Sequence, residues 1–262
     1  MIRALFNAAT GMKAQQLRID VTSNNLANVN TTGFKRQRAE FQDLLYMNIE
    51  RMGVTSSDGG TIVPTGVQVG SGVKAGSVYR ITTQGSVTQT ENPYDLAMQG
   101  DGYFVIDMPD GTQAYTRAGN FSVSADGQLV TEDGFVVSPG IAIPEEAVDV
   151  TISAVGMVQV RLAGEVDYQE LGQIDLARFI NPAGLDAIGD NLFLETPSSG
   201  PANLGTPGAV GFGSVLQGFL ETSNVNAVNE ISALIVAQRA YEMNSKVITT
   251  ADEMLGVTSQ LR

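Results

Sequence analysis

The chain has 262 residues, 43% hydrophobic and 6% aromatic, a size that predicts one large domain or two to three small ones. It contains no cysteine, histidine or tryptophan, which excludes thiol nucleophiles, Ser-His-Asp triads, histidine-ligated metals and disulfides. The net charge is −13, and residues 51–220 hold six basic and nineteen acidic side chains. This acidic middle argues against nucleic-acid binding and favours a solvated acidic surface over a cation site.

An apolar seam at helical spacing opens the chain and predicts an amphipathic helix. Its positions are Ile2, Leu5, Ala9, Met12, Gln16, Ile19, Ser23 and Leu26. In the opening segment MIRALFNAATGMKAQQ, Asn7 and Lys13 interrupt the apolar run that a cleavable signal peptide needs, so we expect mature helix here. We also expect no transmembrane segment, because no apolar run approaches the ~20 residues that a spanning helix requires.

The next segment, SNNLANVNTTGFKRQ at residues 23–37, is rich in asparagine. Asparagine tolerates left-handed backbone angles, Gly33 offers a site for positive φ, and Phe34 supplies an apolar anchor. The pattern favours a shaped turn joining two packed segments over a ligand pocket. Asn30-Thr31-Thr32 also matches the short, common N-glycosylation sequon. Amphipathic spacing returns in KRQRAEFQDLLY, after the turn.

Residues 48–76 are rich in glycine, serine and threonine and predict an extended connector with a short strand or two. Glycines at 70, 72 and 76 do not fit the GxGxxG spacing, and strand-like residues follow them, so a phosphate loop is not expected.

Short β-prone runs separated by turn dipeptides fill the middle of the chain. The dipeptides Asp110-Gly111, Asp126-Gly127 and Asp133-Gly134 are hairpin signals, so we predict a compact antiparallel β domain. Asp101, Asp107 and Asp110 are conceivable paired carboxylates for acid–base catalysis. Because Asp110 precedes a glycine, turn chemistry is the preferred interpretation, and neither a catalytic nor a metal site is predicted.

A second long seam occupies the end of the chain and predicts a helix from about residue 227 to 255. Its positions are Ile231, Leu234, Gln238, Tyr241, Ser245, Ile248, Asp252 and Leu255. Asn226 is the expected N-cap, with Glu230 in the first turn where the helix dipole favours a carboxylate. Both seams are narrow, and packing the two helices as a coiled coil is the economical way to cover them. An ordinary helix pair within a globular core is the alternative.

Several motifs resemble those of the bacterial flagellar rod and hook family. The terminal ones are TSNNLANVNTTGFKR and ETSNVNAVNEISALIVAQRAYEMNSKVITTADEML, and the middle ones are GDGYFVI, YTRAGNFSVSADGQLVTEDGFVV and NLFLETPSSG. The resemblance covers nearly the whole chain. Length and the insert YMNIERMGVTSSDGGTIVPTGVQVGSGV look most like the distal-rod branch of that family, and a proximal rod or hook-type paralogue is the alternative.

The resemblance implies an α+β subunit whose terminal helices form the inner layer of a tubular assembly. The expected domains are 1–46, an N-terminal helical segment; 47–95, an extended connector and short strands; 96–195, an outer β domain; 196–225, a return connector; and 226–262, the C-terminal helix. The residues expected at the assembly interface are Ile2, Leu5, Ala9, Met12, Ile19, Leu26, Asn25, Asn28, Gly33, Phe34, Ile231, Leu234, Gln238, Tyr241, Ile248 and Leu255. Residues 48–72 are expected to reach an adjacent subunit.

The function implied by the resemblance is structural: a self-assembling section of a hollow drive shaft that carries torque from motor to hook across the periplasm. Implied partners are further copies of the chain, proximal rod proteins, hook or hook-junction proteins and the L- and P-ring bushing proteins. Export through the flagellar type III apparatus, without a cleavable signal, is also implied, and neither cofactor nor nucleic acid is expected. Two other functions remain open: a carboxylate-based hydrolase of cell-wall glycan, and an adhesin with an acidic ligand face.

Overall fold

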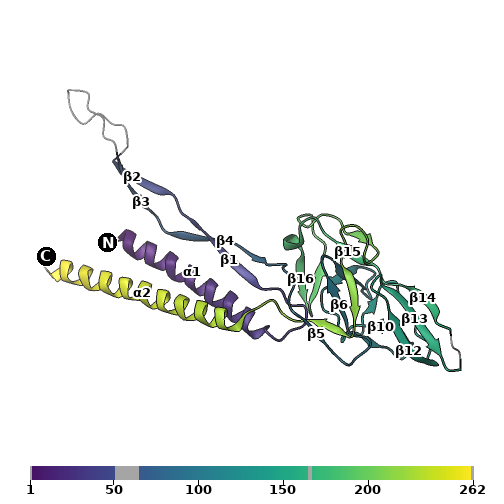
Figure 1. Cartoon of the computed structure of the whole chain (residues 1–262). Coiled ribbons are helices and arrows are strands. Elements are labelled where there is room, and N and C mark those ends of the chain that lie inside the picture. The colour runs from purple at the N-terminus through teal and green to yellow at the C-terminus, as the bar shows by residue number, and fades with distance from the viewer. Residues whose placement is uncertain (1, 51–64, 165–166, 261–262) are drawn as a thin grey trace. The chain divides into compact units, whose positions relative to one another are not determined.

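The computed structural model describes residues 2–50, 65–164 and 167–260 and divides into two compact units (Figure 1). The helical unit comprises the described parts of residues 1–26, 37–79 and 226–262. The β unit comprises residues 27–36 and the described parts of 80–225. The chain therefore passes from one unit to the other at four points, and the predicted α+β class is confirmed.

Helices α1 (Ile2–Ala27) and α2 (Ala227–Gln260) dominate the helical unit. They run in opposite directions, which brings the two termini to the same end of this unit (Figure 1). The predicted cap of α2 is confirmed, because the side-chain oxygen of Asn226 accepts a 3.1 Å hydrogen bond from the backbone N–H of Asn229. Glu230 lies in the first turn, as predicted.

Replacing Asn226 by alanine should destabilise the first turn of α2 by about 0.5–2 kcal/mol, because an orphan backbone donor loses its acceptor. Amide hydrogen exchange over residues 227–231 of the monomer measures this loss. Asn229→Ala is the matched control, since it removes an exposed amide side chain from the same turn and leaves the cap in place. Equal exchange in both variants would show that the cap contributes nothing.

Residues 37–43 lie within the expected N-terminal helical segment, but they form strand β1 (Gln37–Asp43). The side chain of Asn25 explains the start of this strand. Its oxygen accepts from the backbone N–H of Gln37 and its nitrogen donates to the Gln37 carbonyl, each at 2.8 Å. The pairing mimics a neighbouring strand and holds residue 37 extended. Ala39 and Phe41 are then half-buried on one face, so the apolar positions follow the two-residue period of a strand.

Two narrow β ribbons accompany the helices, confirming the short strands predicted in the connector. Their strands pair as β1 with β4 (Val73–Arg80) and as β2 (Tyr46–Glu50) with β3 (Val67–Gly70). Helix α1 packs along them: the Asn7 side chain donates to the carbonyl of Gly70 at 3.2 Å, and Thr10 Oγ1 accepts from the N–H of Val73 at 3.4 Å. Residues 51–64, within the segment expected to reach an adjacent subunit, lie outside the described residues.

Among the described residues, the β unit is built on an antiparallel sheet of nine strands. Seven of them have the order β16-β17-β8-β7-β11-β10-β9; strand β15 also pairs with β7, and β18 pairs with β15. Its strands are β7 (Tyr103–Asp107), β8 (Gln113–Thr116), β9 (Ser122–Val123), β10 (Leu129–Val130), β11 (Val136–Val137), β15 (Leu176–Arg178), β16 (Asp186–Gly189), β17 (Leu192–Leu194) and β18 (Asn203–Gly205). A short 3-10 helix, η1, spans Pro182–Gly184.

Smaller sheets complete this unit. They are β12-β13-β14 (Ala147–Ile152, Met157–Leu162, Gln169–Gln173), β19-β6 (Ser214–Gln217, Leu96–Gln99) and β20-β5 (Phe219–Glu221, Val87–Gln89). Strand β7 lies at the centre and is buried on both faces. Phe104 and Ile106 enter one apolar cluster, whereas Tyr103 and Val105 enter another on the opposite face. Burial on both faces explains why the GYFVI run is continuously apolar and does not alternate with polar residues.

The predicted Asp-Gly turns are confirmed. Gly111, Gly127 and Gly134 all have positive φ, between 78° and 84°, which residues with a Cβ adopt at a cost. Each donates its N–H to the carbonyl three residues earlier, closing the tight turns that join successive strands.

A helical assembly surface as the candidate functional site

Helices α1 and α2 contact each other at two described points. The Asn25 side chain donates a 3.1 Å hydrogen bond to the carboxylate of Glu230, and both residues are buried. Further along, a Cβ placed on Gly11 would lie 3.0 Å from the Asn244 side chain. The second point therefore brings a glycine of α1 against an amide side chain of α2.

The least exposed positions of α2 follow a seven-residue repeat. Glu230, Ala237 and Ala251 are buried and Asn244 is half-buried, and we call these four residues the contact line. The predicted seam shares Leu234 and Ile248 with this face, and both are half-buried. Four other positions, Ile231, Gln238, Ser245 and Asp252, each follow a contact-line residue by one, and they are exposed, as are Tyr241 and Leu255. Two of the four contact-line residues are alanines, whereas the larger residues of the predicted seam are half-buried or exposed, so hydrophobicity did not mark the buried face.

A second repeat on α2 is apolar and exposed. Its members, the apolar stripe, are Val236, Met243, Val247 and Met254, whose side chains are 57%, 63%, 45% and 48% exposed. Intervals of 7, 4 and 7 residues place them in a nearly straight row, and Val236 precedes contact-line residue Ala237, so the row lies about 100° around the helix axis from that line. Contiguous apolar rows exposed on a monomer are typical of interaction surfaces.

The residues expected at the assembly interface occupy varied environments. Exposed are Ile2, Ile231, Gln238, Tyr241 and Leu255; half-buried are Leu5, Ala9, Met12, Ile19, Leu26, Asn28, Phe34, Leu234 and Ile248; buried are Asn25 and Gly33. The structure brings Asn25 to Glu230 but places Gly33 in the β unit, where its N–H donates to the carbonyl of Glu221 at 2.8 Å. Their roles in assembly stay a prediction.

The backbone of Gly33 shows whether the asparagine-rich segment is a shaped turn or a ligand pocket. Its φ is +69°, and a Cβ there would lie 2.6 Å from the backbone nitrogen of Ala118. Both the backbone angle and the close approach require glycine. The segment is therefore a shaped turn, as predicted, and its last residues are anchored in the β unit.

A buried ion cluster, not expected from the sequence, lies beside this turn. Glu221 is 1% exposed and accepts from Lys35 Nζ at 2.6 Å and from Arg117 Nε at 2.7 Å. We call these three residues the Glu221 cluster. Burial alone would raise the pKa of the Glu221 carboxyl, but the charges of Arg117 and Lys35 and their hydrogen bonds together hold that pKa below its usual value.

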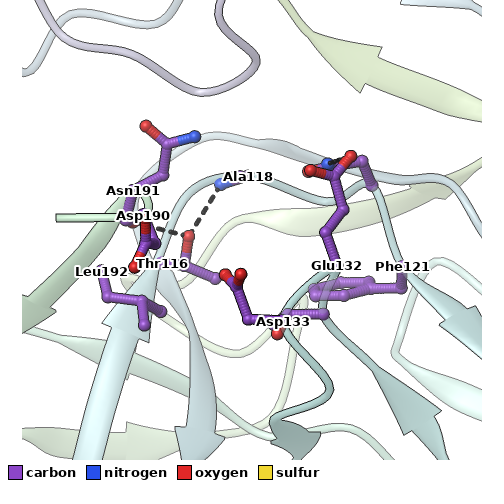
Figure 2. A pocket seen from close by; sticks show the side chains of 10 residues that line it. Thr116, Ala118, Phe121, Glu132, Asp133, Asp190, Asn191 and Leu192 are labelled. Atoms are coloured by element: carbon purple, nitrogen blue, oxygen red, sulfur yellow. Dashed lines mark hydrogen bonds between the residues drawn. The ribbon is translucent and has the colours of Figure 1, made fainter.

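Figure 2 shows a polar pocket in the β unit, with a volume of about 260 Å³. The loop of Glu132 and Asp133 and the turn of Asp190 and Asn191 form part of its lining. The polar groups around it hold these loops in place: Asn120 donates to Glu132 at 2.7 Å, and Thr116 Oγ1 donates to the carbonyl of Asn191 at 2.8 Å. Their hydrogen bonds indicate a structural role for these side chains.

Two of the three carboxylates considered for catalysis, Asp107 and Asp110, bond within the β7–β8 hairpin. Asp110 accepts from the backbone N–H and the hydroxyl of Thr112, at 2.9 and 2.6 Å, and the hydroxyl bond lowers the pKa of Asp110. Asp107 accepts a weak 3.4 Å bond from Gln113 across the same hairpin. Within the described ranges no three acidic side chains gather in a way that could hold a metal ion, and neither helix carries a stretch long and apolar enough to cross a membrane.

Three sequence models of protein families match the chain. They are the flagella basal body rod protein at residues 5–35, the flagellar hook protein FlgE/F/G D1 domain at residues 97–160, and the flagellar basal body rod FlgEFG protein C-terminal region at residues 216–261. They match α1 with the following turn, the first half of the β unit, and α2 with the strands before it. These matches define a structural protein of the bacterial flagellum.

Relatives that match the chain over its full length are proteins of the flagellar rod. The flagellar basal-body rod protein FlgG of Caulobacter vibrioides is 66% identical, with 100% of both chains covered. The proteins of the same name from Agrobacterium fabrum and Borreliella burgdorferi are 51% and 50% identical, with at least 99% of each chain covered. The chain belongs to the flagellar basal-body rod protein family and is a structural subunit of the rod.

Proposed function

We propose that the protein builds the distal part of the rod, where many copies form a hollow helical shaft that transmits torque from the motor towards the hook. The proposal rests on the full-length similarity to rod proteins, and the exposed apolar stripe on α2 supports it. Contact between this stripe and a different surface of the next copy is heterologous. A heterologous contact that does not close into a ring generates a helical filament.

The proposed assembly places residues 1–46 and 226–262 in the inner layer around the channel, and residues 96–195 in the outer layer. The exposed acidic side chains of the β unit, such as Asp126, Asp133 and Glu145, would then keep the outer surface hydrated against the L- and P-ring bushing proteins. Proximal rod proteins and hook or hook-junction proteins would be the axial neighbours. The subunit would leave the cytoplasm through the type III export apparatus and would need no catalytic activity.

Electron microscopy of purified basal bodies, labelled with an antibody against residues 100–190, tests the location. We expect label on the distal part of the shaft, at the L and P rings. Label restricted to the hook would identify a hook-type paralogue, and label at the base of the shaft a proximal rod protein. Straight tubes formed by the purified protein would establish self-assembly independently of the label.

A further inference from the structure

Each crossing of the chain between the two units borders one of three segments of the β unit. These segments are residues 27–36, residues 80–86 and residues 221–225. The crossings fall before residue 27, after residue 36, before residue 80 and after residue 225. Force that passes along the backbone into the β unit therefore enters through one of these three segments, and contacts that join the segments would distribute it among them.

The Glu221 carboxylate joins all three segments. It belongs to the last segment, binds Lys35 of the first at 2.6 Å, and accepts from the backbone N–H of Gly85 in the second at 2.8 Å. Lys35 also donates to the carbonyl of Thr83 at 3.0 Å. The backbone carbonyl of Glu221 accepts the N–H of Gly33 at 2.8 Å, so one residue holds both neighbouring segments with side-chain and main-chain atoms.

Asn224 makes a second set of connections among the same segments. Its side-chain oxygen accepts from the N–H of Arg36 at 2.7 Å, and its nitrogen donates to the carbonyls of Ile81 and Thr83, each at 2.9 Å. The N–H of Ile81 in turn donates to the carbonyl of Arg36 at 2.8 Å. Residues at or next to three of the four crossings are thus bonded directly to one another.

Arg117 connects this set to the sheet. It directly follows β8, binds Glu221 at 2.7 Å and donates to the carbonyls of Gly100 and Gly102, each at 2.5 Å. These glycines lie between β6 and β7, the strand buried on both faces. The rigid core therefore fixes the position of the Glu221 side chain.

We propose that Glu221 and Asn224 are positioning residues of a staple that couples the three segments, so that none of them opens from the β unit without loosening the other two. The mechanical consequence rests on the proposed shaft function. Twist that enters through one crossing would be shared among all of them and passed to the sheet through Arg117, which stiffens the connection beyond what independent linkers provide.

Hydrogen exchange on the full-length monomer tests the coupling. In Glu221→Gln, we expect the amides of Gly33, Ile81, Gly85 and Thr222 to exchange at least tenfold faster, and together. The amides of β7 and β13, which report the stability of the whole β unit, should accelerate by a smaller factor than these four. Acceleration of Ile81 is the specific sign of coupling, because a loss of purely local packing would affect only the amides that bond to Glu221 or directly follow it, which are Gly33, Gly85 and Thr222.

Asn224→Ala is the second variant, because it leaves the Glu221 cluster in place and loses only amide hydrogen bonds. It should accelerate Ile81 and Gly33 together, although Gly33 does not bond to Asn224. Arg161→Gln is the matched control, since it removes an exposed ion pair with Asp149 elsewhere in the β unit and should change none of these rates.

Acceleration confined to direct partners in both folded variants would overturn the staple. If Glu221→Gln fails to fold, the Asn224→Ala result decides alone. The exchange measurement uses the monomer, so a result without correlated acceleration would not contradict the rod proposal. Likewise, failure of the unmodified protein to enter the rod would not contradict the coupling.

Discussion

Replacing both Met243 and Val247 by aspartate is expected to abolish assembly and to leave the monomer folded. Both side chains are exposed in the monomer, so its stability should change by no more than about 0.5 kcal/mol. In a filament that covers the apolar stripe, two carboxylates would be buried without partners, and each buried, unpaired charge costs about 2–5 kcal/mol. Since every 1.4 kcal/mol is a factor of ten, the critical concentration should rise at least about 100-fold.

The measurement combines sedimentation of assembled material with circular dichroism of the monomer and swimming of cells that carry the variant. Ser245→Asp with Thr249→Asp is the matched control, because it adds the same two charges to exposed positions on roughly the opposite side of α2. This control should assemble. Ser245 belongs to the seam expected from the sequence, so the comparison also separates that seam from the apolar stripe.

Normal tubes from the Met243→Asp, Val247→Asp variant would remove the apolar stripe from the interface. If the control variant alone failed to assemble, the interface would lie along the seam expected from the sequence. Loss of helix signal in the dilute monomer of the first variant would show that these side chains stabilise α2 itself, contrary to their exposure.

Local chemistry explains which parts of the fold the sequence could predict. Apolar spacing of three and four residues identified α1 and α2, and Asn226 marked the start of α2 because an N-cap acts on its own first turn. Asp-Gly dipeptides located the β turns for the same reason. Each of these signals depends on residues a few positions apart, where backbone geometry alone decides the outcome.

Strand β1 and the packed face of α2 required tertiary information. The residues of β1 fit either period, and the bonds from Asn25 to Gln37 select the extended form. On α2, Ala237 and Ala251 are buried while larger apolar residues beside them are exposed, an outcome that hydrophobicity does not encode. The Glu221 cluster joins Lys35 and Glu221 across 186 residues, and no spacing rule connects side chains so distant in the chain.

Replacing Glu221 by alanine should destabilise the β unit by about 3–5 kcal/mol. The substitution leaves Lys35 and Arg117 buried, close together and without their shared carboxylate, and an uncompensated buried charge is costly in a low-dielectric interior. Denaturant unfolding followed by tyrosine fluorescence reports on this unit, because Tyr103 and Tyr115 are buried in its core. Glu170→Ala is the control, since Glu170 is exposed on β14 and bonds only weakly with Gln159 at 3.2 Å.

The stability difference between the natural chain and Glu221→Ala should also depend on pH. The pKa of Glu221 is held below its ordinary value of 4.5, so its carboxylate stabilises the folded state fully above that pH. As pH falls through the lowered pKa, the folded carboxylate takes up a proton and this contribution is lost. The difference should therefore be constant near neutrality and shrink below about pH 4.5, whereas the Glu170→Ala difference stays small throughout. A Glu221→Ala difference that persists unchanged into acid would show that packing of the side chain, and not its charge, holds the cluster together.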